Sequence, residues 1–363
     1  MKIAIMGTRG IPANYGGFET FAEKVSIGLV EKGHDVTVYC RTNNVSYNEP
    51  FYKGVKLVKL PTIQHKYADT VAHTFLSVVH SLIHRYDVIL ICNSANSIFS
   101  FIPRITNQKI AINVDGLEWQ RAKWNYWGKL TYRISEFLAT FLPNHVVTDS
   151  RFIENYYLRK FKKNSTFIPY GATTKKIDTN GVLKKYKLEA NKYVLFVSRL
   201  EPENNAHLVV KAFEKTKTDM KLVVVGDAPY NEEYIENLKE TKDERIIFTG
   251  YVFGKGYAEF QSNAYFYVQA TEVGGTHPAL LEGMGYGNCV LATDVPEHRE
   301  ALSDAGIYFK KDVSDLAQKM QYLLDNPKVI KNYSKRALTR IEKYYSWESI
   351  IDSYEKLFKR LNK

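Results

Sequence analysis

The chain repeats one pattern: a short apolar run, a turn, and a stretch whose apolar residues have helical spacing. Residues 2–6 form the first run. A loop with four glycines, a helix over residues 18–32 and a second run at residues 35–40 follow it. Fully apolar strands separated by helices are typical of a parallel sheet that is covered on both faces. The pattern therefore predicts an α/β fold that opens with a βαβ unit.

This pattern occurs twice in the sequence. The first series continues with expected strands at residues 55–60, 87–92, 108–113, 146–148 and 166–168, with helical stretches at 67–85 and 95–103. A lysine-rich linker is expected at 172–190, and the second series has expected strands at 193–197, 221–225, 246–249 and 265–268. Two series of similar size in 363 residues predict two Rossmann-like domains that face each other across a cleft.

Composition narrows the class of protein. No apolar run approaches the ~18 residues of a membrane span, and the apolar run at the N-terminus is too short for a secretory signal. The three cysteines are far apart, which suits a reducing cytoplasm and gives no metal-ligand spacing. Residues 1–170 hold 21 lysines and arginines against 12 aspartates and glutamates, so phosphates, an acidic membrane or a nucleic acid are candidate partners. A solvated basic face without a partner is the alternative.

The glycine loop after the first strand does not match either of two common nucleotide-binding motifs. It begins Gly7-Thr8-Arg9-Gly10, in which Arg9 breaks the GxGxxG pattern, and the sequence holds no GxxxxGK[ST] motif. NAD and Walker-type ATP sites are therefore disfavoured. The loop instead ends in Tyr15-Gly16-Gly17-Phe18-Glu19, where two glycines at a helix start allow a ligand to approach the backbone closely.

Residues 271–300 predict a phosphate site. The turn around Gly274, Gly275 and Thr276 leads into a helix with Pro278 in its first turn. Free backbone N–H groups and the helix dipole favour a phosphate at such a turn. Glu282 lies one to two turns further on, within reach of a ribose next to that phosphate. An ordinary capped helix between a loop and a strand is the alternative.

Two further segments carry unusual composition. The loop at residues 114–124 combines Asp115, Glu118 and two tryptophans just after an expected parallel strand, where α/β sheets bind ligands. Residues 121–163 are both basic and aromatic, which fits amphipathic helices at a membrane interface and equally fits core-facing helices with a solvated lysine face.

In order along the chain, these segments resemble the retaining GT-B glycosyltransferases of family 4. The motifs are Gly16-Gly17-Phe18-Glu19, Ile168-Pro169-Tyr170-Gly171, Ser198-Arg199-Leu200, Val225-Gly226-Asp227, Glu282-Gly283-Met284 and Tyr345-Ser346-Trp347-Glu348. A bacterial branch that includes β-1,4-rhamnosyltransferases of surface-polysaccharide assembly is similar in Asp115-Gly116-Leu117-Glu118-Trp119, Glu201-Pro202-Glu203-Asn204-Asn205 and Gly274-Gly275-Thr276. The resemblance implies a GT-B fold with an acceptor domain at 1–170, a nucleotide-sugar domain at 171–345 and a C-terminal helix at 346–363 that returns to the first domain.

The resemblance also implies roles for single residues, with three departures. Gly274 stands where the family has the first of two glutamates, so only Glu282 is carried over, as the ribose ligand. Asn204 replaces the family's diphosphate-binding lysine, which leaves Arg199 as the main cation, and Asp115 replaces a histidine near the donor sugar. We expect Asp115, Arg199 and Glu118 in catalysis. The expected donor-binding residues are Gly16, Gly17, Arg199, Asn204, Asn205, Tyr251, Gly274, Gly275, Thr276 and Glu282.

The expected reaction moves a sugar, by branch resemblance L-rhamnose from dTDP-L-rhamnose, to a lipid-linked or oligosaccharide acceptor. Arg199 and the backbone donors of the glycine turn would stabilise the leaving diphosphate, and no metal or other cofactor is expected. The resemblance places the protein in the cytoplasm or at the inner face of the membrane, in contact with anionic lipid and without nucleic acid. The alternatives are a UDP-hexose donor, a sugar-nucleotide epimerase, an inactive donor-binding subunit, and a non-catalytic protein that binds an anionic membrane or nucleic acid.

Overall fold

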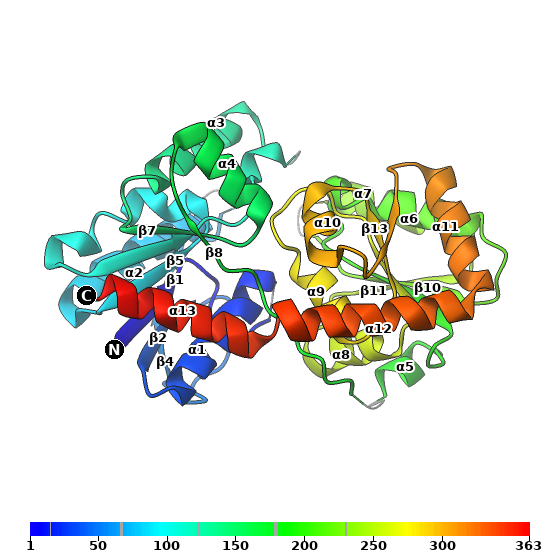
Figure 1. Cartoon of the computed structure of the whole chain (residues 1–363), viewed down its shortest axis with the longest axis horizontal. Coiled ribbons are helices and arrows are strands. Elements are labelled where there is room, and N and C mark those ends of the chain that lie inside the picture. Colours follow the sequence, from blue (N-terminus) through cyan, green and yellow to red (C-terminus); the bar gives the residue numbers. More distant parts are fainter. Residues whose placement is uncertain (15, 66–67, 122–123, 178–180, 229–230) are drawn as a thin grey trace. The chain divides into compact units, whose positions relative to one another are not determined.

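A computed structural model describes residues 1–14, 16–65, 68–121, 124–177, 181–228 and 231–363 (Figure 1). The chain divides into two compact units. Unit 1 comprises Met1–Tyr170 and Trp347–Lys363, and unit 2 comprises Gly171–Ser346. The expected α/β fold with two Rossmann-like, parallel-sheet domains is confirmed.

Unit 1 is built on a sheet of eight described strands in the order β3-β4-β2-β1-β5-β6-β7-β8. Neighbouring strands are parallel except for the pair β3–β4. The strands are β1 (Lys2–Met6), β2 (Asp35–Arg41), β3 (Phe51–Tyr52), β4 (Val55–Leu60), β5 (Val88–Cys92), β6 (Lys109–Asn113), β7 (His145–Thr148) and β8 (Thr166–Phe167).

The helices of unit 1 are α1 (Gly17–Glu31), α2 (Asp69–His84), α3 (Tyr126–Ala139), α4 (Arg151–Phe161) and α13 (Trp347–Leu361), with short 3₁₀ turns η1 (Ser94–Phe99), η2 (Pro103–Thr106) and η3 (Glu118–Gln120). The helix expected at 95–103 is wrong, because 3₁₀ turns replace it. Side chains there bond the backbone locally: Asn93 accepts from the Ala95 N–H, and Asn96 donates to the Cys92 carbonyl. The C-terminal helix α13 packs against α1, where Lys32 lies 2.6 Å from Asp352.

Unit 2 has a sheet of six described strands in the order β11-β10-β9-β12-β13-β14, with all neighbours parallel. The strands are β9 (Tyr193–Val197), β10 (Lys221–Val225), β11 (Ile246–Gly250), β12 (Phe266–Gln269), β13 (Val290–Thr293) and β14 (Ile307–Phe309). The helices are α5 (Val182–Lys185), η4 (Pro202–Asn204), α6 (Ala206–Glu214), α7 (Glu232–Lys239), α8 (Gly254–Asn263), α9 (Pro278–Gly285), α10 (Pro296–Leu302), α11 (Val313–Asp325) and α12 (Pro327–Tyr344).

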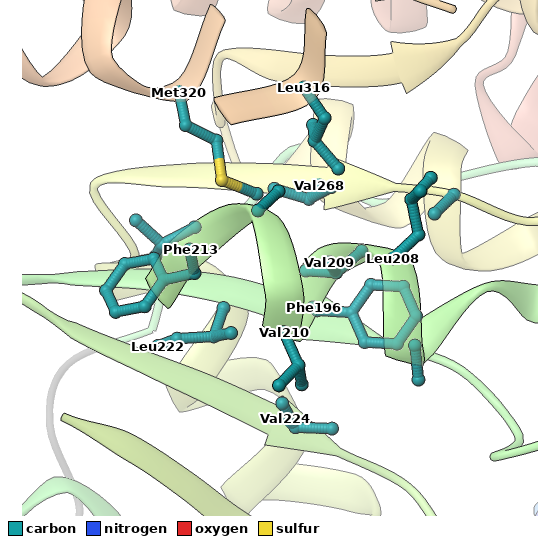
Figure 2. Packing of buried hydrophobic residues seen from close by; sticks show 14 of the residues in the cluster. Phe196, Leu208, Val209, Val210, Phe213, Leu222, Val224, Val268, Leu316 and Met320 are labelled. Atoms are coloured by element: carbon teal, nitrogen blue, oxygen red, sulfur yellow. The ribbon is translucent and has the colours of Figure 1, made fainter. Parts of the chain in front are cut away.

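The core of unit 2 consists of apolar side chains from its helices and strands. Figure 2 shows Phe213 of α6 near Leu222 of β10, while Leu316 and Met320 reach in from α11 toward Val268. These side chains are fully buried, and each contributes about 1.5–3 kcal/mol of hydrophobic free energy on burial. These buried side chains therefore hold α6 and α11 against the sheet.

Residues 172–190, expected as a linker, pack onto unit 2 where they are described. Ala172 forms a parallel bridge with Ser346, and Leu183 and Leu188 are buried. The N–H groups of Val182 and Leu183 both donate to the carboxylate of Glu259. The segment was expected to be a linker because its many lysines outnumber the few apolar residues, such as Leu183 and Leu188, that bury it.

Both sheets have a point at which the strand order reverses. In unit 1 it lies between β1 and β5, and in unit 2 between β9 and β12. Ligands of open α/β sheets bind beyond the carboxyl ends of the strands at such points. The two switch points therefore define where functional residues are to be sought in each unit.

Candidate functional site

The switch point of unit 2 gathers most of the residues expected to bind a donor. Arg199 lies just past the carboxyl end of β9, and the turn at residues 271–276 follows β12, the neighbouring strand. Tyr251 follows β11 at the same edge, where its ring stacks on that of Phe253 at a centroid distance of 5.5 Å. The expected turn, cation and aromatic residue thus lie at one edge of one sheet.

The backbone after β10 passes very close to the backbone after β9. Gly226 directly follows β10 and has a φ of +140°, and a Cβ atom there would lie 1.8 Å from the Ser198 carbonyl oxygen. Only glycine fits such a position, for both conformational and steric reasons. Gly226 therefore holds the loop after β10 tightly against the segment that carries Arg199.

The segment after β9 fixes Arg199 through its backbone. The Asn204 side chain donates to the Arg199 carbonyl oxygen at 2.7 Å, and the Asn205 side chain donates to the Ala270 carbonyl at 2.9 Å. Both asparagines are buried. The Arg199 guanidinium is about one-third exposed, and its Nη1 lies 3.5 Å from Glu201 Oε1. Asn204 therefore stabilises the Arg199 loop itself, and Asn205 joins that loop to Ala270, just past β12. The expected contact of both residues with a donor stays a prediction.

Glu282 lies on α9 among tyrosines. The Tyr257 hydroxyl donates to Glu282 Oε2 at 2.6 Å, and the Gln261 side chain donates to the same hydroxyl at 3.1 Å. Burial, together with the Glu282 charge, raises the pKa of Tyr257 and Tyr267 well above its usual range and that of Tyr286 to about 12. All three phenols therefore stay protonated at neutral pH, and Tyr257 holds the carboxylate in one orientation.

The glycine turn rests on a pair of histidines. His298 is fully buried, its Nδ1 lies 2.8 Å from the Thr293 carbonyl oxygen, and burial lowers its pKa to about 4. A neutral His298 must donate from Nδ1 to that carbonyl, so its Nε2 accepts from His277 Nδ1 at 3.1 Å. The His277 ring lies under the turn, because a Cβ on Gly274 would meet its Nε2 at 2.5 Å. His298 therefore fixes the position of the His277 ring against the turn at residues 274–276, where His277 Nε2 also lies 3.4 Å from the Val273 carbonyl oxygen.

The switch point of unit 1 holds Gly16, Gly17 and a buried carboxylate. Gly17 begins α1, and Glu19 in its first turn is only 4% exposed. Glu19 Oε1 accepts the Arg9 N–H at 2.9 Å, while burial raises the pKa of the carboxyl. Glu19 thus closes the glycine loop onto the start of α1. Tyr15 lies outside the described residues.

Asp115 occupies the loop after β6, with φ of +56°. Its Oδ1 accepts from the Tyr170 hydroxyl at 3.4 Å, and its N–H donates to the Asn113 side chain at 3.1 Å. Burial, and then the charge of Glu118, raise the pKa of Asp115 to about 6, although the Arg121 charge opposes this. An acid with such a pKa exchanges protons near neutral pH, as catalytic carboxyls do.

Glu118, unlike Asp115, forms an ion pair with another described residue. Its Oε1 accepts from Arg121 Nε at 2.7 Å, and both side chains are buried. The expected catalytic role of Glu118 stays a prediction, and its contact here is an ion pair that anchors the loop. Ala122 and Lys123, part of the loop at residues 114–124, lie outside the described residues.

The structure brings the expected residues together in two groups, one in each unit. Sequence reasoning did not anticipate the supporting contacts of Tyr257, His277, His298 and Tyr170, although Tyr170 lies in one of the family motifs. The only signal for His277 was its position at the turn itself, one residue before Pro278. Tyr257 and His298 lie 25 and 16 residues from Glu282 in sequence, on other helices, so spacing gave no hint of them.

Comparison with solved structures gives the class of fold. Sucrose-phosphate synthase from Thermosynechococcus elongatus superposes with a TM-score of 0.84 at 19% identity, covering 99% of this chain and 98% of that one. HepE from Anabaena in complex with UDP superposes with a TM-score of 0.78 at 14% identity, covering 99% and 100%. The chain accordingly has the GT-B fold, in agreement with the sequence expectation.

Comparison with protein families narrows the class. Residues 191–326 match the family described as "Glycosyl transferases group 1", and residues 1–173 match "Domain of unknown function (DUF1972)". Each of these matches covers less than half of the 363 residues. Within unit 2, the matched residues resemble the group 1 glycosyltransferases.

Two curated relatives are bacterial glycosyltransferases. N-acetylgalactosamine-N,N'-diacetylbacillosaminyl-diphospho-undecaprenol 4-alpha-N-acetylgalactosaminyltransferase of Campylobacter jejuni is 26% identical over 159 residues, or 42% of this chain. O-antigen chain mannosyltransferase B of Escherichia coli is 25% identical over 175 residues, or 46% of this chain. The chain spans less than half the length of each relative, 43% and 46%.

Proposed function

We propose that this chain is a retaining, family 4 glycosyltransferase that moves L-rhamnose from dTDP-L-rhamnose to a lipid-linked saccharide during surface-polysaccharide assembly. The observation that carries the transferase assignment is the site at the β9–β12 switch point. There a cation, a glycine turn at a helix start and the half-buried carboxylate of Glu282 lie in a segment that matches the group 1 glycosyltransferases. Support for rhamnose comes from the branch motifs around Asp115 and Gly274.

The proposed roles in unit 2 follow from the chemistry of each group. The bond between the anomeric carbon and the phosphate oxygen breaks, and the negative charge of the leaving diphosphate is stabilised by Arg199 and the backbone N–H groups of residues 274–276. Glu282, held by Tyr257, accepts hydrogen bonds from the ribose hydroxyls. We further propose that no metal ion assists, so activity should survive EDTA.

Unit 1 supplies the proposed acceptor side. The acceptor hydroxyl oxygen forms the new bond to the anomeric carbon, and its proton leaves with the diphosphate. Asp115 orients the acceptor or stabilises the positive charge that develops on the sugar. Its pKa of about 6 leaves it ionised above that pH, which both roles require.

Transfer assays test the proposal. The chain is incubated with dTDP-L-rhamnose, UDP-glucose, UDP-GalNAc or GDP-mannose and a lipid-linked saccharide extract, and the product is analysed by mass spectrometry and by NMR of the new anomeric centre. Transfer of rhamnose with retention is expected. Inversion would contradict the retaining mechanism, and release of a different sugar nucleotide without an acceptor would indicate an epimerase.

A UDP-hexose donor is the second candidate, because HepE, which has the same fold, was solved with UDP and with UDP-glucose. The same panel separates the two candidates, since transfer from UDP-glucose or UDP-GalNAc alone would replace rhamnose as the donor sugar. Binding without any transfer would favour the inactive donor-binding subunit.

A further inference from the structure

Helix α2 presents its apolar residues outward. Its exposed stripe consists of side chains that are each 37–78% accessible: Val71, Phe75, Leu76, Val79 and Ile83. Its inward side is mostly polar, with His73, Thr74, Ser77 and Ser81 all buried. A surface helix of an ordinary globular domain has the opposite arrangement. The outward face of α2 therefore needs an apolar or interfacial partner.

The buried polar side of α2 is compatible with this orientation. The hydroxyl of Thr74 donates to the Thr70 carbonyl at 2.9 Å, that of Ser77 to the His73 carbonyl at 2.7 Å, and that of Ser81 to the Val78 carbonyl at 2.6 Å. Each buried hydroxyl thus has a partner within the helix and needs none from the sheet. These three hydroxyls are therefore satisfied while the apolar stripe faces outward, whereas the ring nitrogens of the buried His73 have no hydrogen-bond partner among the described residues.

Helix α3 shows the same inversion. Its exposed side chains are 51–73% accessible and largely aromatic: Tyr126, Trp127, Ile134 and Phe137, followed by Phe141 just beyond the helix. Ser135, Glu136 and Ala139 form its buried side. Because two helices of unit 1 expose apolar side chains, the exposed stripe of α2 is not a peculiarity of that helix alone.

Hydrogen bonds and a ring contact join the two helices into one surface. The Ser97 hydroxyl of η1 donates to the Ser135 carbonyl of α3 at 2.6 Å, and the rings of Phe75 on α2 and Phe99 on η1 lie 5.6 Å apart. The Arg104 guanidinium of η2 donates to the Leu142 carbonyl at 2.6 Å. Between the helices, η1 and η2 add further exposed apolar side chains. We name this surface the apolar face of unit 1; its members are Val71, Phe75, Leu76, Val79, Ile83, Ile98, Phe101, Ile105, Tyr126, Trp127, Ile134, Phe137 and Phe141.

The charges around this face are positive. Arg104, Lys129 and Arg133 lie on the elements that form it. The carboxylates of α2, η1, η2 and α3, all of whose residues are described, are Asp69 and Glu136. Asp69 pairs with Arg41 at 2.5 Å, and Glu136 is buried and accepts the Tyr156 hydroxyl at 2.8 Å. By sequence, unit 1 holds 25 lysines and arginines against 15 aspartates and glutamates.

We propose that the apolar face of unit 1 docks on an anionic lipid surface, with its aromatic and aliphatic side chains in the interfacial region and its cations against the headgroups. Interfacial helices bury an apolar face at this depth, and basic residues next to them bind anionic lipid. A second copy of the chain fits the charge less well, because an interface between identical faces would bring Arg104, Lys129 and Arg133 toward their own copies. The inference goes beyond sugar transfer and needs neither donor nor acceptor.

Vesicle binding by the full-length chain tests this docking. Co-sedimentation is measured with vesicles of phosphatidylcholine alone and with 30% phosphatidylglycerol added, at two salt concentrations. Binding is expected only with the anionic vesicles, and it should weaken as salt rises. The double variant Trp127→Ser/Phe137→Ser should lower the partition coefficient roughly tenfold or more, since two exposed aromatic residues no longer enter the interface.

Matched controls come from unit 2. The variant Tyr322→Ser removes an aromatic side chain of similar exposure and should leave binding unchanged. Lys129→Glu/Arg133→Glu should lower binding to anionic vesicles by at least about fivefold per cation, whereas Lys331→Glu/Lys335→Glu on α12 should not. Circular dichroism and thermal melting of each variant confirm the fold, and all substituted residues lie outside the proposed catalytic groups.

Two results would overturn the proposal. The first is equal binding of wild type and Trp127→Ser/Phe137→Ser, or no binding to anionic vesicles at all. The second is a dimer in analytical ultracentrifugation that the same double variant dissociates, which would assign the apolar face to a second copy of the chain.

Discussion

The buried acid Asp115 gives a stability prediction whose sign and size follow from one pKa. Burial and the Glu118 charge raise this pKa from 3.8 to about 6. A raised carboxyl pKa means that the folded state resists ionisation, so its stabilising effect is complete below pH 3.8 and is lost as pH rises through 6. The loss amounts to about 1.5 kcal/mol at pH 5 and levels off at about 3 kcal/mol by pH 8.

The variant Asp115→Asn removes the ionisation and keeps the shape of the side chain. We therefore expect the stability of the variant relative to wild type to increase by about 1.5 kcal/mol between pH 5 and pH 8. Scanning calorimetry of the full-length chain at both pH values gives this double difference, which cancels any pH-independent effect of the amide, such as a changed contact with Tyr170. A relative stability that stays constant or falls over this range would refute the reasoning.

Three further predictions concern unit 2. Gly226→Ala should destabilise the unit by more than about 3 kcal/mol, because its Cβ would meet a carbonyl at 1.8 Å; Gly254→Ala, also at positive φ but in open space, should cost only about 1 kcal/mol. Comparable urea midpoints for the two alanine variants would contradict this. Tyr257→Phe should cost about 1.5–3 kcal/mol of stability, as it deletes the 2.6 Å hydrogen bond to Glu282, and donor affinity should fall with it; an unchanged melting curve counts against that bond. His298→Phe should weaken donor binding in calorimetry while the unit stays folded, since the turn loses its support, and wild-type affinity in this variant would show that the turn needs none.

The strands and the position of the glycine turn at residues 274–276 were predictable because local sequence determines them. Apolar runs such as residues 193–197 admit few alternatives, and the turn at 274–276 combines glycines with a following Pro278. Arg199 was singled out by the motif Ser198-Arg199-Leu200, through the family resemblance. These features depend on neighbours within a few positions.

The remaining features depend on contacts between distant segments. Tyr257 supports Glu282 from α8, and His298 supports His277 from α10, so no local spacing reveals either pair. The outward apolar stripe of α2 was also missed, because periodicity shows that a helix has an apolar side but not which side the sheet covers. Only the packed structure decides that.

The most direct test of the central claim is calorimetric donor binding at the β9–β12 switch point. Wild type, Glu282→Ala and the exposed control Glu342→Ala are titrated with dTDP-L-rhamnose, UDP-glucose, UDP-galactose, UDP-GlcNAc and GDP-mannose. We predict that one donor binds wild type and Glu342→Ala equally, and that Glu282→Ala loses at least about tenfold in affinity. If no sugar nucleotide binds wild type, or if Glu282→Ala binds as tightly as wild type, the site around Glu282 is not the donor site.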